Sequence, residues 1–175
     1  EWVGGGGDLT ILGGLKAGKF DAIMAVPEWQ SAAEGEGFGQ VIYDVQDEKA
    51  WNRVFSGPIP VTVGYTLRET LEKSPDLVQA YVNANYRAQQ WIRRAKDDEV
   101  VELLHKPYMD TFKREDVLKS VRYYKTIFDW DFLIDEKDYD NGMKVFIPMA
   151  IEKPLPFARV VDLSFVRKAQ AKYRS

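Results

Sequence analysis

Four consecutive glycines, at residues 4–7, are the first feature of this sequence that could bind a ligand. Glycines at the start of a helix leave backbone N–H groups uncovered, and such groups bind phosphate in nucleotide-binding proteins. The spacing here does not fit, because neither the complete G-x-x-x-x-G-K-[ST] string nor G-x-G-x-x-G occurs. Asp8 also adds a negative charge where the phosphate would lie. We therefore expect no nucleotide, but a strand-to-helix turn at a sheet edge where open α/β folds bind ligands.

A second candidate is the string AVPEWQ at residues 25–30, directly after the apolar run FDAIMAV. The run predicts a buried strand at 20–26, and Pro27 ends it. Glu28 and Trp29 would then emerge at the same sheet edge as the glycines. Glu28 could anchor a polar group, and Trp29 could form an aromatic wall beside a ligand. The alternative for Trp29 is ordinary packing in the core, and the sequence leaves both open.

Nothing else in the sequence argues for catalysis or for a metal site. His105 is the single histidine, no carboxylates are spaced around it, and we expect it at the end of a helix. The chain has no cysteine and no G-x-S-x-G elbow. With a net charge of −3, it has no basic excess to recommend a nucleic acid. No apolar stretch approaches the roughly 18 residues of a membrane span.

The first 67 residues read as alternating strands and helices. Residues 1–3 could be the tail of a strand, and further strands are expected at 20–26 and 40–45. Helices over 8–19 and 27–37 lie between them, and this order implies parallel βαβαβ wiring. Asp8 could cap the first helix. Residues 46–60 break this rhythm, and the SGPIP string is the candidate crossing between two lobes. One more strand is expected at 61–67.

From residue 74 the pattern turns helical. The Ser74-Pro75-Asp76 string predicts a helix start, since it combines a capping hydroxyl, a proline and an acid. Further helices are expected near 97–105, within 113–130, within 135–151 and in part of 158–173. The apolar faces of three of them are predicted to be Leu77, Tyr81, Ala84, Ala88, Trp91 and Ala95; Val117, Val121, Tyr124 and Phe128; and Tyr139, Met143 and Phe146.

Three stretches in this order resemble the solute-binding proteins of ABC importers: LKAGKFDAIMAVPEWQSAAEGEGFGQVIYDV, SPDLVQAYVNANYRAQQWI, and YDNGMKVFI with the later IEKPLPFARVVDLSFVRKA. The similar branch is the nitrate, sulfonate and taurine type, which includes binders of the thiamine pyrimidine precursor. The resemblance implies a two-lobed α/β fold of the type II periplasmic-binding-protein class, with the ligand in the cleft between the lobes.

By this resemblance, residues 1–57 are the end of the second lobe and residues 58–175 return to the first lobe, with one strand and then several helices. The resemblance also implies that the N-terminal portion of the fold, well over a hundred residues, precedes Glu1, and that the signal peptide is not in this chain. The ligand-binding residues it implies are Gly5, Gly6, Gly7, Ala25, Val26, Pro27, Glu28 and Trp29. Ser56 and Gly57 are expected near the hinge.

The function expected from the resemblance is capture of a small solute, such as a sulfonate, nitrate or a pyrimidine precursor, and its delivery to a permease with its ATPase. The location would be periplasmic, or extracellular with a lipid anchor, and membrane contact would come only through the permease. No metal or organic cofactor is implied. Two alternatives on the same fold are a thiamine-pyrimidine synthase-like enzyme and the effector-binding domain of a transcription regulator.

Overall fold

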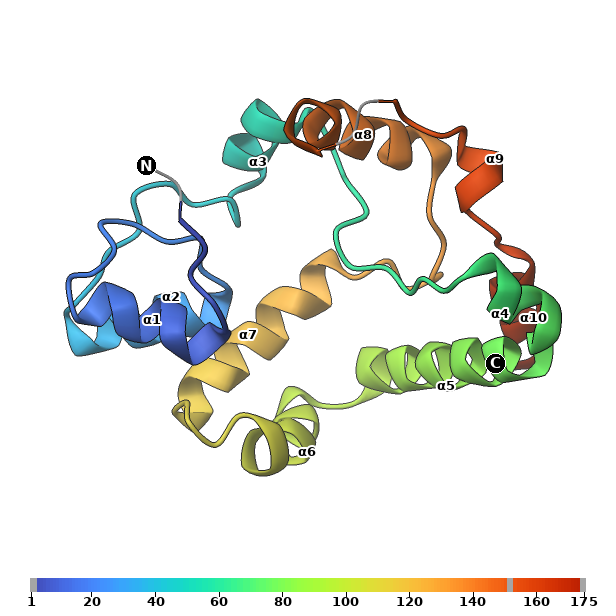
Figure 1. The fold of residues 1–175 in the computed structure, drawn as a ribbon. Coiled ribbons are helices and arrows are strands. Elements are labelled where there is room, and N and C mark those ends of the chain that lie inside the picture. Colours follow the sequence, from blue (N-terminus) through green and yellow to red (C-terminus); the bar gives the residue numbers. More distant parts are fainter. Residues whose placement is uncertain (1–2, 151–152, 174–175) are drawn as a thin grey trace. The chain divides into compact units, whose positions relative to one another are not determined.

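A computed structural model describes residues 3–150 and 153–173, and the regular structure in these residues is helical. Figure 1 shows the helices in chain order. Their bounds are α1 Asp8–Lys16, α2 Pro27–Glu36, α3 Glu48–Phe55, α4 Arg68–Lys73, α5 Pro75–Arg94, α6 Asp97–Tyr108, α7 Arg114–Ile127, α8 Glu136–Ala150, α9 Phe157–Val160 and α10 Ser164–Tyr173.

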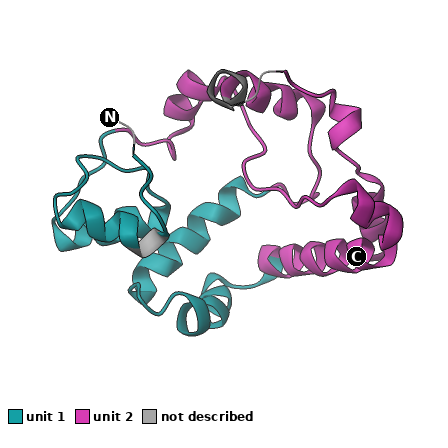
Figure 2. Cartoon of the chain, in the orientation of Figure 1, with its two compact units in different colours: residues 1–42, 94–128 teal, residues 43–93, 129–175 magenta. Residues whose placement is uncertain are grey.

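The chain divides into two compact units, each built from two separate stretches of sequence. Unit 1 contains residues 1–42 and 94–128, and unit 2 contains residues 43–93 and 129–175, coloured separately in Figure 2. The assignment of residues 1–57 to a second lobe and of residues 58–175 to a first lobe stays a prediction, because it concerns the lobes of a larger fold.

Unit 1 is organised around α7, which packs against α2 and against α6. The buried apolar side chains come from all three helices, and they are Trp29, Ala33, Val100, Val101, Val117 and Val121. Val117 and Val121 lie one turn apart on α7, as the sequence predicted for its apolar face. Outside this core, Arg114 of α7 pairs with Asp98 of α6 at 2.7 Å and tethers the two helices at the surface.

Unit 2 has a smaller core around α5 and α10. Tyr86 of α5 is buried, and the centre of its ring lies 6.4 Å from the centre of the Phe132 ring. Val166 and Ala169 of α10 are also buried. Gln79 of α5 donates a hydrogen bond to the carbonyl oxygen of Phe165 at 2.9 Å. This hydrogen bond joins α5 to the first turn of α10.

Most of the predicted helices are confirmed. α2 begins with Pro27 and ends at Gly37, whose φ of +76° is the left-handed conformation that glycine adopts readily. α5 begins at Pro75, directly after Ser74, with Asp76 in its first turn. The predicted cap of α1 is wrong in register, because Gly7 is the capping residue and the helix already includes Asp8.

The three segments predicted as strands are not strands in this structure. Residues 20–26, 40–45 and 61–67 form neither a helix nor a ladder within the described chain. A strand exists only when a neighbour accepts and donates its backbone hydrogen bonds, and none of these segments lies in register with another. The strand tail expected at 1–3 falls largely on residues 1–2, outside the described residues. The α/β, two-lobed fold class therefore stays a prediction.

Two further sequence expectations are corrected. Residues 46–60 contain a helix, α3, which begins where the Asp47 carboxylate accepts a hydrogen bond from Ala50 N at 2.8 Å. The sequence pattern did not predict this helix, because eight residues are too few to show a repeating apolar pattern. The short α4 was also not predicted.

The predicted apolar face of α5 is wrong as well. Leu77 and Tyr81 are 66% and 59% exposed, Trp91 is 41% exposed, and the buried residue is Tyr86 on another side of the helix. The physical reason is that Gln79 and Gln90 donate hydrogen bonds to the carbonyl oxygens of Phe165 and Trp130. These bonds determine which side of α5 packs against the rest of unit 2. On α8, Tyr139 and Met143 of the predicted face are half-buried, and the Phe146 side chain lies outside the described ones.

Candidate functional site

The predicted ligand residues belong to two helix starts in unit 1, and the contacts of α1 and α2 show how these starts are arranged. Lys16, the last residue of α1, forms an ion pair with Glu36, the last residue of α2, at 2.5 Å. Leu15 also lies 3.4 Å from the position that a Cβ atom on Gly39 would occupy. Since the carboxyl ends meet and the helices have similar lengths, α1 and α2 run in the same direction, as Figure 1 shows. Their amino ends therefore point toward the same side of unit 1.

The glycine segment forms the amino end of α1. The carbonyl oxygen of Gly7 accepts hydrogen bonds from the backbone N–H groups of Thr10 and Ile11. A Cβ atom on Gly5 would come within 2.6 Å of Ile11 Cγ1, and Gly6 has a φ of +76°. Both positions therefore require glycine, and no side-chain hydrogen bond caps this helix.

The second helix start is built by Ala25, Val26 and Pro27. Val26 caps α2 through its carbonyl oxygen, which accepts from the N–H groups of Trp29 and Gln30, and no side-chain hydrogen bond caps this helix. Ala25 is exposed and Val26 is half-buried. Pro27 lacks an N–H group and has the φ of a first helical residue, so it starts the helix without leaving a donor unpaired.

Glu28 contacts α7, in a way that the sequence did not indicate. The hydroxyl group of Ser120 lies 3.1 Å from Glu28 Oε2 and 3.1 Å from the carbonyl oxygen of Asp116. A hydroxyl has one hydrogen, so Ser120 donates to one of these acceptors at a time. Burial, followed by the negative charge of Glu28 and the neighbouring Tyr123, raises the pKa of the Tyr124 phenol. Glu28 thus lies within electrostatic reach of two hydroxyl groups on α7.

These α7 residues follow the spacing of a single helix face. Asp116, Ser120 and Tyr124 are four residues apart, so they line one side of α7, next to the apolar pair Val117 and Val121. Asp116 is 7% exposed, and its carboxylate accepts from Lys119 at 3.2 Å. The spacing of these three polar residues was visible in the sequence, but nothing in the sequence indicated that this side of α7 packs against α2.

The contacts that the structure shows at Ser120 are hydrogen bonds. Ser120 has no imidazole beside it, because Nε2 of His105 is 2.8 Å from the carbonyl oxygen of Phe112. His105 lies in the last turn of α6, as predicted. Among the side chains that the structure describes, no three of the His, Asp or Glu type come together as a metal site.

Trp29 is 8% exposed, and it belongs to the helix surface that packs in unit 1. This burial agrees with the packing interpretation. It does not decide the ligand-wall interpretation, since a cleft between lobes would involve residues beyond unit 1. The assignment of residues 5–7 and 25–29 to a ligand site stays a prediction.

The residues expected at the hinge have an unusual backbone. Ser56 and Gly57 have φ angles of +58° and +139°, and the second of these is open only to glycine. The carbonyl oxygen of Gly57 accepts from Trp51 Nε1 at 2.8 Å. A Cβ atom on Gly57 would come within 2.9 Å of Asn141 Nδ2, so the turn after α3 is closely packed against α8.

Unit 2 contains a separate open groove of about 1320 Å³, beside α4, α9 and α10. Its lining includes Arg68, Arg159 and Arg167 together with apolar side chains of residues 155–161.

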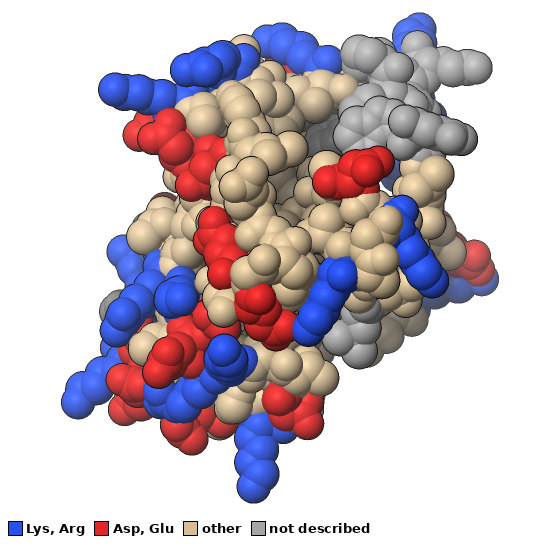
Figure 3. All heavy atoms as spheres, turned by 90° about the vertical axis from the view of Figure 1, so that its left-hand side faces the viewer, with Lys and Arg blue, Asp and Glu red and all other residues tan. Residues whose placement is uncertain are grey.

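On the face drawn in Figure 3, acidic and basic side chains are interspersed. In the described part of the chain, no helix is both long and apolar enough to cross a membrane.

Comparison with known proteins finds a distant relative. Over 163 residues the chain is 22% identical to the "Putative binding protein YtlA" of Bacillus subtilis (strain 168), a match that covers 91% of this chain and 46% of that protein. The chain thus spans about half the length of this relative. No protein-family profile matches the chain. No solved structure matches it either.

Proposed function

We propose that this chain is part of the substrate-binding component of an ABC importer. The observation that carries the proposal is the similarity to a binding protein, which extends over 91% of the chain. The ordered motifs described above, from the LKAGKFDA string to the closing VDLSF string, support the nitrate, sulfonate and taurine branch. The fold proposed for the complete protein is the two-lobed type II class.

In this proposal the ligand lies at the amino ends of α1 and α2, and the shared direction of the two helices supports this placement. The first N–H groups of a helix have no partner within the helix, so those of α1 and α2 can donate hydrogen bonds to a solute. The Glu28 carboxylate, which lies 3.1 Å from the Ser120 hydroxyl, adds a hydrogen-bond acceptor in the first turn of α2. Such a site suits a small polar solute that offers both hydrogen-bond acceptors and donors, such as the sulfonate taurine or a pyrimidine precursor.

The proposal contains no catalytic step. The solute is held by closure of two lobes, because contacts with both lobes shift the population toward the closed form. It is then released to a permease, whose ATPase supplies the energy. The proposed location is the periplasm, or the outer surface of a cell through a lipid anchor.

The first experiment is to read the gene upstream of Glu1. A signal peptide followed by a further lobe would support transport, whereas a helix-turn-helix would instead support a regulator. The product of the complete reading frame is then titrated by calorimetry with taurine, nitrate and a thiamine pyrimidine precursor. Saturable binding of one of these supports the proposal, and the absence of binding to all three contradicts it.

The site is tested by Trp29→Ala in the same product. Loss of a large apolar contact should weaken binding by about 1–3 kcal/mol, or roughly 5- to 150-fold in Kd. Trp91→Ala is the matched control, since Trp91 is 41% exposed and lies outside the proposed site. If the melting temperature falls while the affinity of the folded molecules is unchanged, Trp29 is a core residue and the site assignment is wrong.

A further inference from the structure

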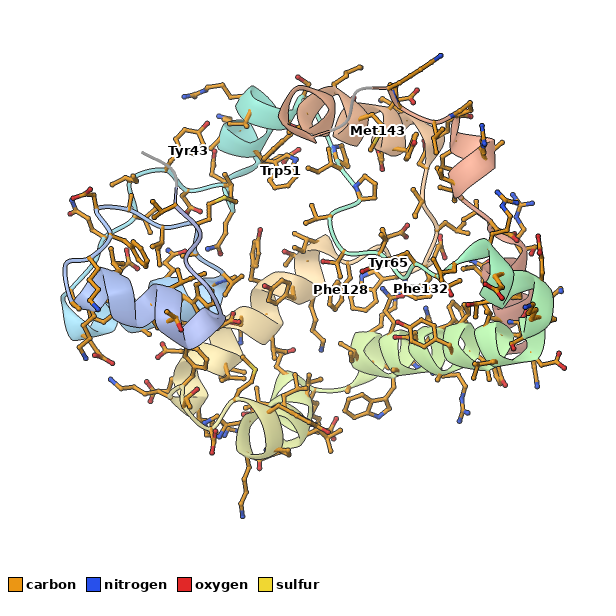
Figure 4. All side chains as sticks on the ribbon, viewed as in Figure 1. Tyr43, Trp51, Tyr65, Phe128, Phe132 and Met143 are labelled. Carbon is orange, nitrogen blue, oxygen red and sulfur yellow. The ribbon has the colours of Figure 1, made fainter. Side chains whose placement is uncertain are left out.

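Ser120 supplies a buried hydroxyl group on α7, next to the amino end of α2. The residue is 3% exposed, and its Oγ lies 3.1 Å from Glu28 Oε2. Glu28 is in the first turn of α2, where the proposed function places the ligand. Figure 4 shows the side chains along α7, with Phe128 labelled directly after the helix end. One oxygen of the Glu28 carboxylate is thus held by a neighbour within unit 1.

The Ser120 hydroxyl does not need Glu28 to satisfy its own hydrogen bonding. It also lies 3.1 Å from the carbonyl oxygen of Asp116, one turn earlier on α7, and serines inside helices commonly donate to that carbonyl. Of the two acceptors, the charged carboxylate gives the stronger bond. Residues beyond this chain can add to the burial of Ser120, but they are not needed to create it. The contact therefore serves the carboxylate, because it fixes the orientation of Glu28.

The position of Glu28 beside α7 is set by the packing of the two helices. α2 and α7 pack against each other, and each contributes buried apolar side chains, Trp29 and Val117 among them. Burial, followed by the charge of Glu28, raises the pKa of the Tyr124 phenol, one turn after Ser120. The carboxylate thus lies along the side of α7 that carries these two hydroxyl residues.

The chemistry of Glu28 limits the solute that it can contact. A carboxylate accepts hydrogen bonds and has no hydrogen to donate, so the solute group beside it must be a donor. Taurine carries an ammonium group and the thiamine pyrimidine precursor an amino group, whereas nitrate has no hydrogen at all. Hydrogen bonds between a carboxylate and a charged N–H group are among the strongest in proteins.

On the basis of the proposed function, we propose that Ser120 is a positioning residue of the ligand site. It holds Oε2 of Glu28, so that the carboxylate is oriented to accept a hydrogen bond from an amino or ammonium group of the solute. The solute is therefore an amine-bearing compound, and nitrate is excluded.

The first test compares probes that differ in one group, with the product of the complete reading frame. Taurine and ethanesulfonate share the sulfonate, but ethanesulfonate lacks the amino group. Calorimetry should show that taurine binds about tenfold more tightly or better, the scale of one hydrogen bond to a charged group. If the pyrimidine precursor is the solute, it should exceed the same ring without its amino group by a similar factor.

The outcomes of this comparison separate the two proposals. Equal affinities within the pair that binds, or nitrate as the solute that binds, would overturn the present inference and leave the transport proposal standing. The absence of binding to every probe contradicts the transport proposal, and this inference with it.

The second test separates a positioning role of Ser120 from a structural one. Ser120→Ala should weaken the binding of the amine-bearing probe by about 2- to 10-fold and leave its amine-free counterpart unchanged. In a Glu28→Ala background the same substitution should have no further effect, since Ser120 acts through Glu28. Thr126→Val is the matched control, because it removes a hydroxyl of the same helix that donates to the carbonyl oxygen of Tyr123 at 2.7 Å.

Affinities in the second test are expressed per folded molecule, with the folded fraction measured by circular dichroism. An equal loss for both members of a probe pair would show that Ser120 is structural. An undiminished effect of Ser120→Ala in the Glu28→Ala background would show that it does not act through Glu28.

Discussion

α7 and α5 are both long helices for which the sequence predicts an apolar face, and α7 buries the first half of that face, although Phe128 lies beyond the helix end and is 37% exposed. Val117 and Val121 of α7 are 1% and 7% exposed, whereas Leu77 and Tyr81 of α5 are 66% and 59% exposed. α7 lies between two other helices, α2 and α6, and their side chains cover its apolar residues. An apolar stripe therefore indicates what a helix can bury, and the available partners decide whether it does.

α5 is fixed in a different way. Its side chains Gln79 and Gln90 donate hydrogen bonds to the carbonyl oxygens of Phe165 and Trp130, at 2.9 and 2.6 Å. One tyrosine, Tyr86, supplies the buried apolar contact. We therefore expect the two helices to respond oppositely to the same kinds of substitution.

The largest effect is expected from Val117→Ala on α7. Removing two buried methyl groups and leaving a cavity should lower the free energy of unfolding by about 2–3 kcal/mol. The matched substitution on α5, Leu77→Ala, removes a larger side chain from an exposed site and should change it by less than about 0.5 kcal/mol. Urea unfolding followed by circular dichroism measures both. A cost for Leu77→Ala as large as that for Val117→Ala would show that α5 buries its predicted face.

An intermediate effect is expected from Gln79→Ala on α5. The substitution removes the hydrogen bonds to Phe165 O and to Asn83 Oδ1, at 2.9 and 3.0 Å. Such bonds contribute about 0.5–1.5 kcal/mol each on balance. Because Oε1 of Gln79 is buried without a partner in the described chain, its removal offsets part of the loss. We expect a net cost of about 1 kcal/mol, larger than that of Leu77→Ala two residues away. A smaller cost than for Leu77→Ala contradicts the comparison.

The helices were the predictable part of this fold. Local signals such as Pro27, Gly37 and the Ser74-Pro75-Asp76 string act within a few residues, and the structure has helix ends at each of them. The strand predictions at 20–26, 40–45 and 61–67 depended on partners distant in sequence. A short apolar run does not say what it pairs with, and here it pairs with nothing in the described chain.

The candidate site shows the same division. The sequence identified Glu28 and the two glycine-rich or proline-led helix starts, which are local features. It did not indicate Ser120, although the spacing of Asp116, Ser120 and Tyr124 was visible, because only the packing of α2 on α7 brings Glu28 to it. Trp29 remained open between packing and ligand contact, since both interpretations require the same bulky side chain at that position.

The smallest effect is expected from the ion pairs that fasten α7 to α6, and it should appear as a dependence on pH. The hydrogen bond from Lys125 Nζ, at 2.9 Å, lowers the pKa of the Asp97 carboxyl; burial opposes this, and the Lys125 charge and Arg122 contribute further. A carboxyl whose pKa is lower in the folded state stabilises the fold fully above its unfolded value, near 4. That contribution is lost as the pH falls from about 4 through the lower folded value.

Lys125→Met should therefore reduce the free energy of unfolding at pH 7 by about 0.2–1 kcal/mol, the usual range for exposed pairs. It should also flatten the acidic part of the curve of stability against pH. Thermal unfolding between pH 2 and 7 measures this, with Lys106→Met on the exposed side of α6 as the control. If Lys125→Met and Lys106→Met give the same pH profile, the pair of Lys125 with Asp97 does not fasten α7 to α6.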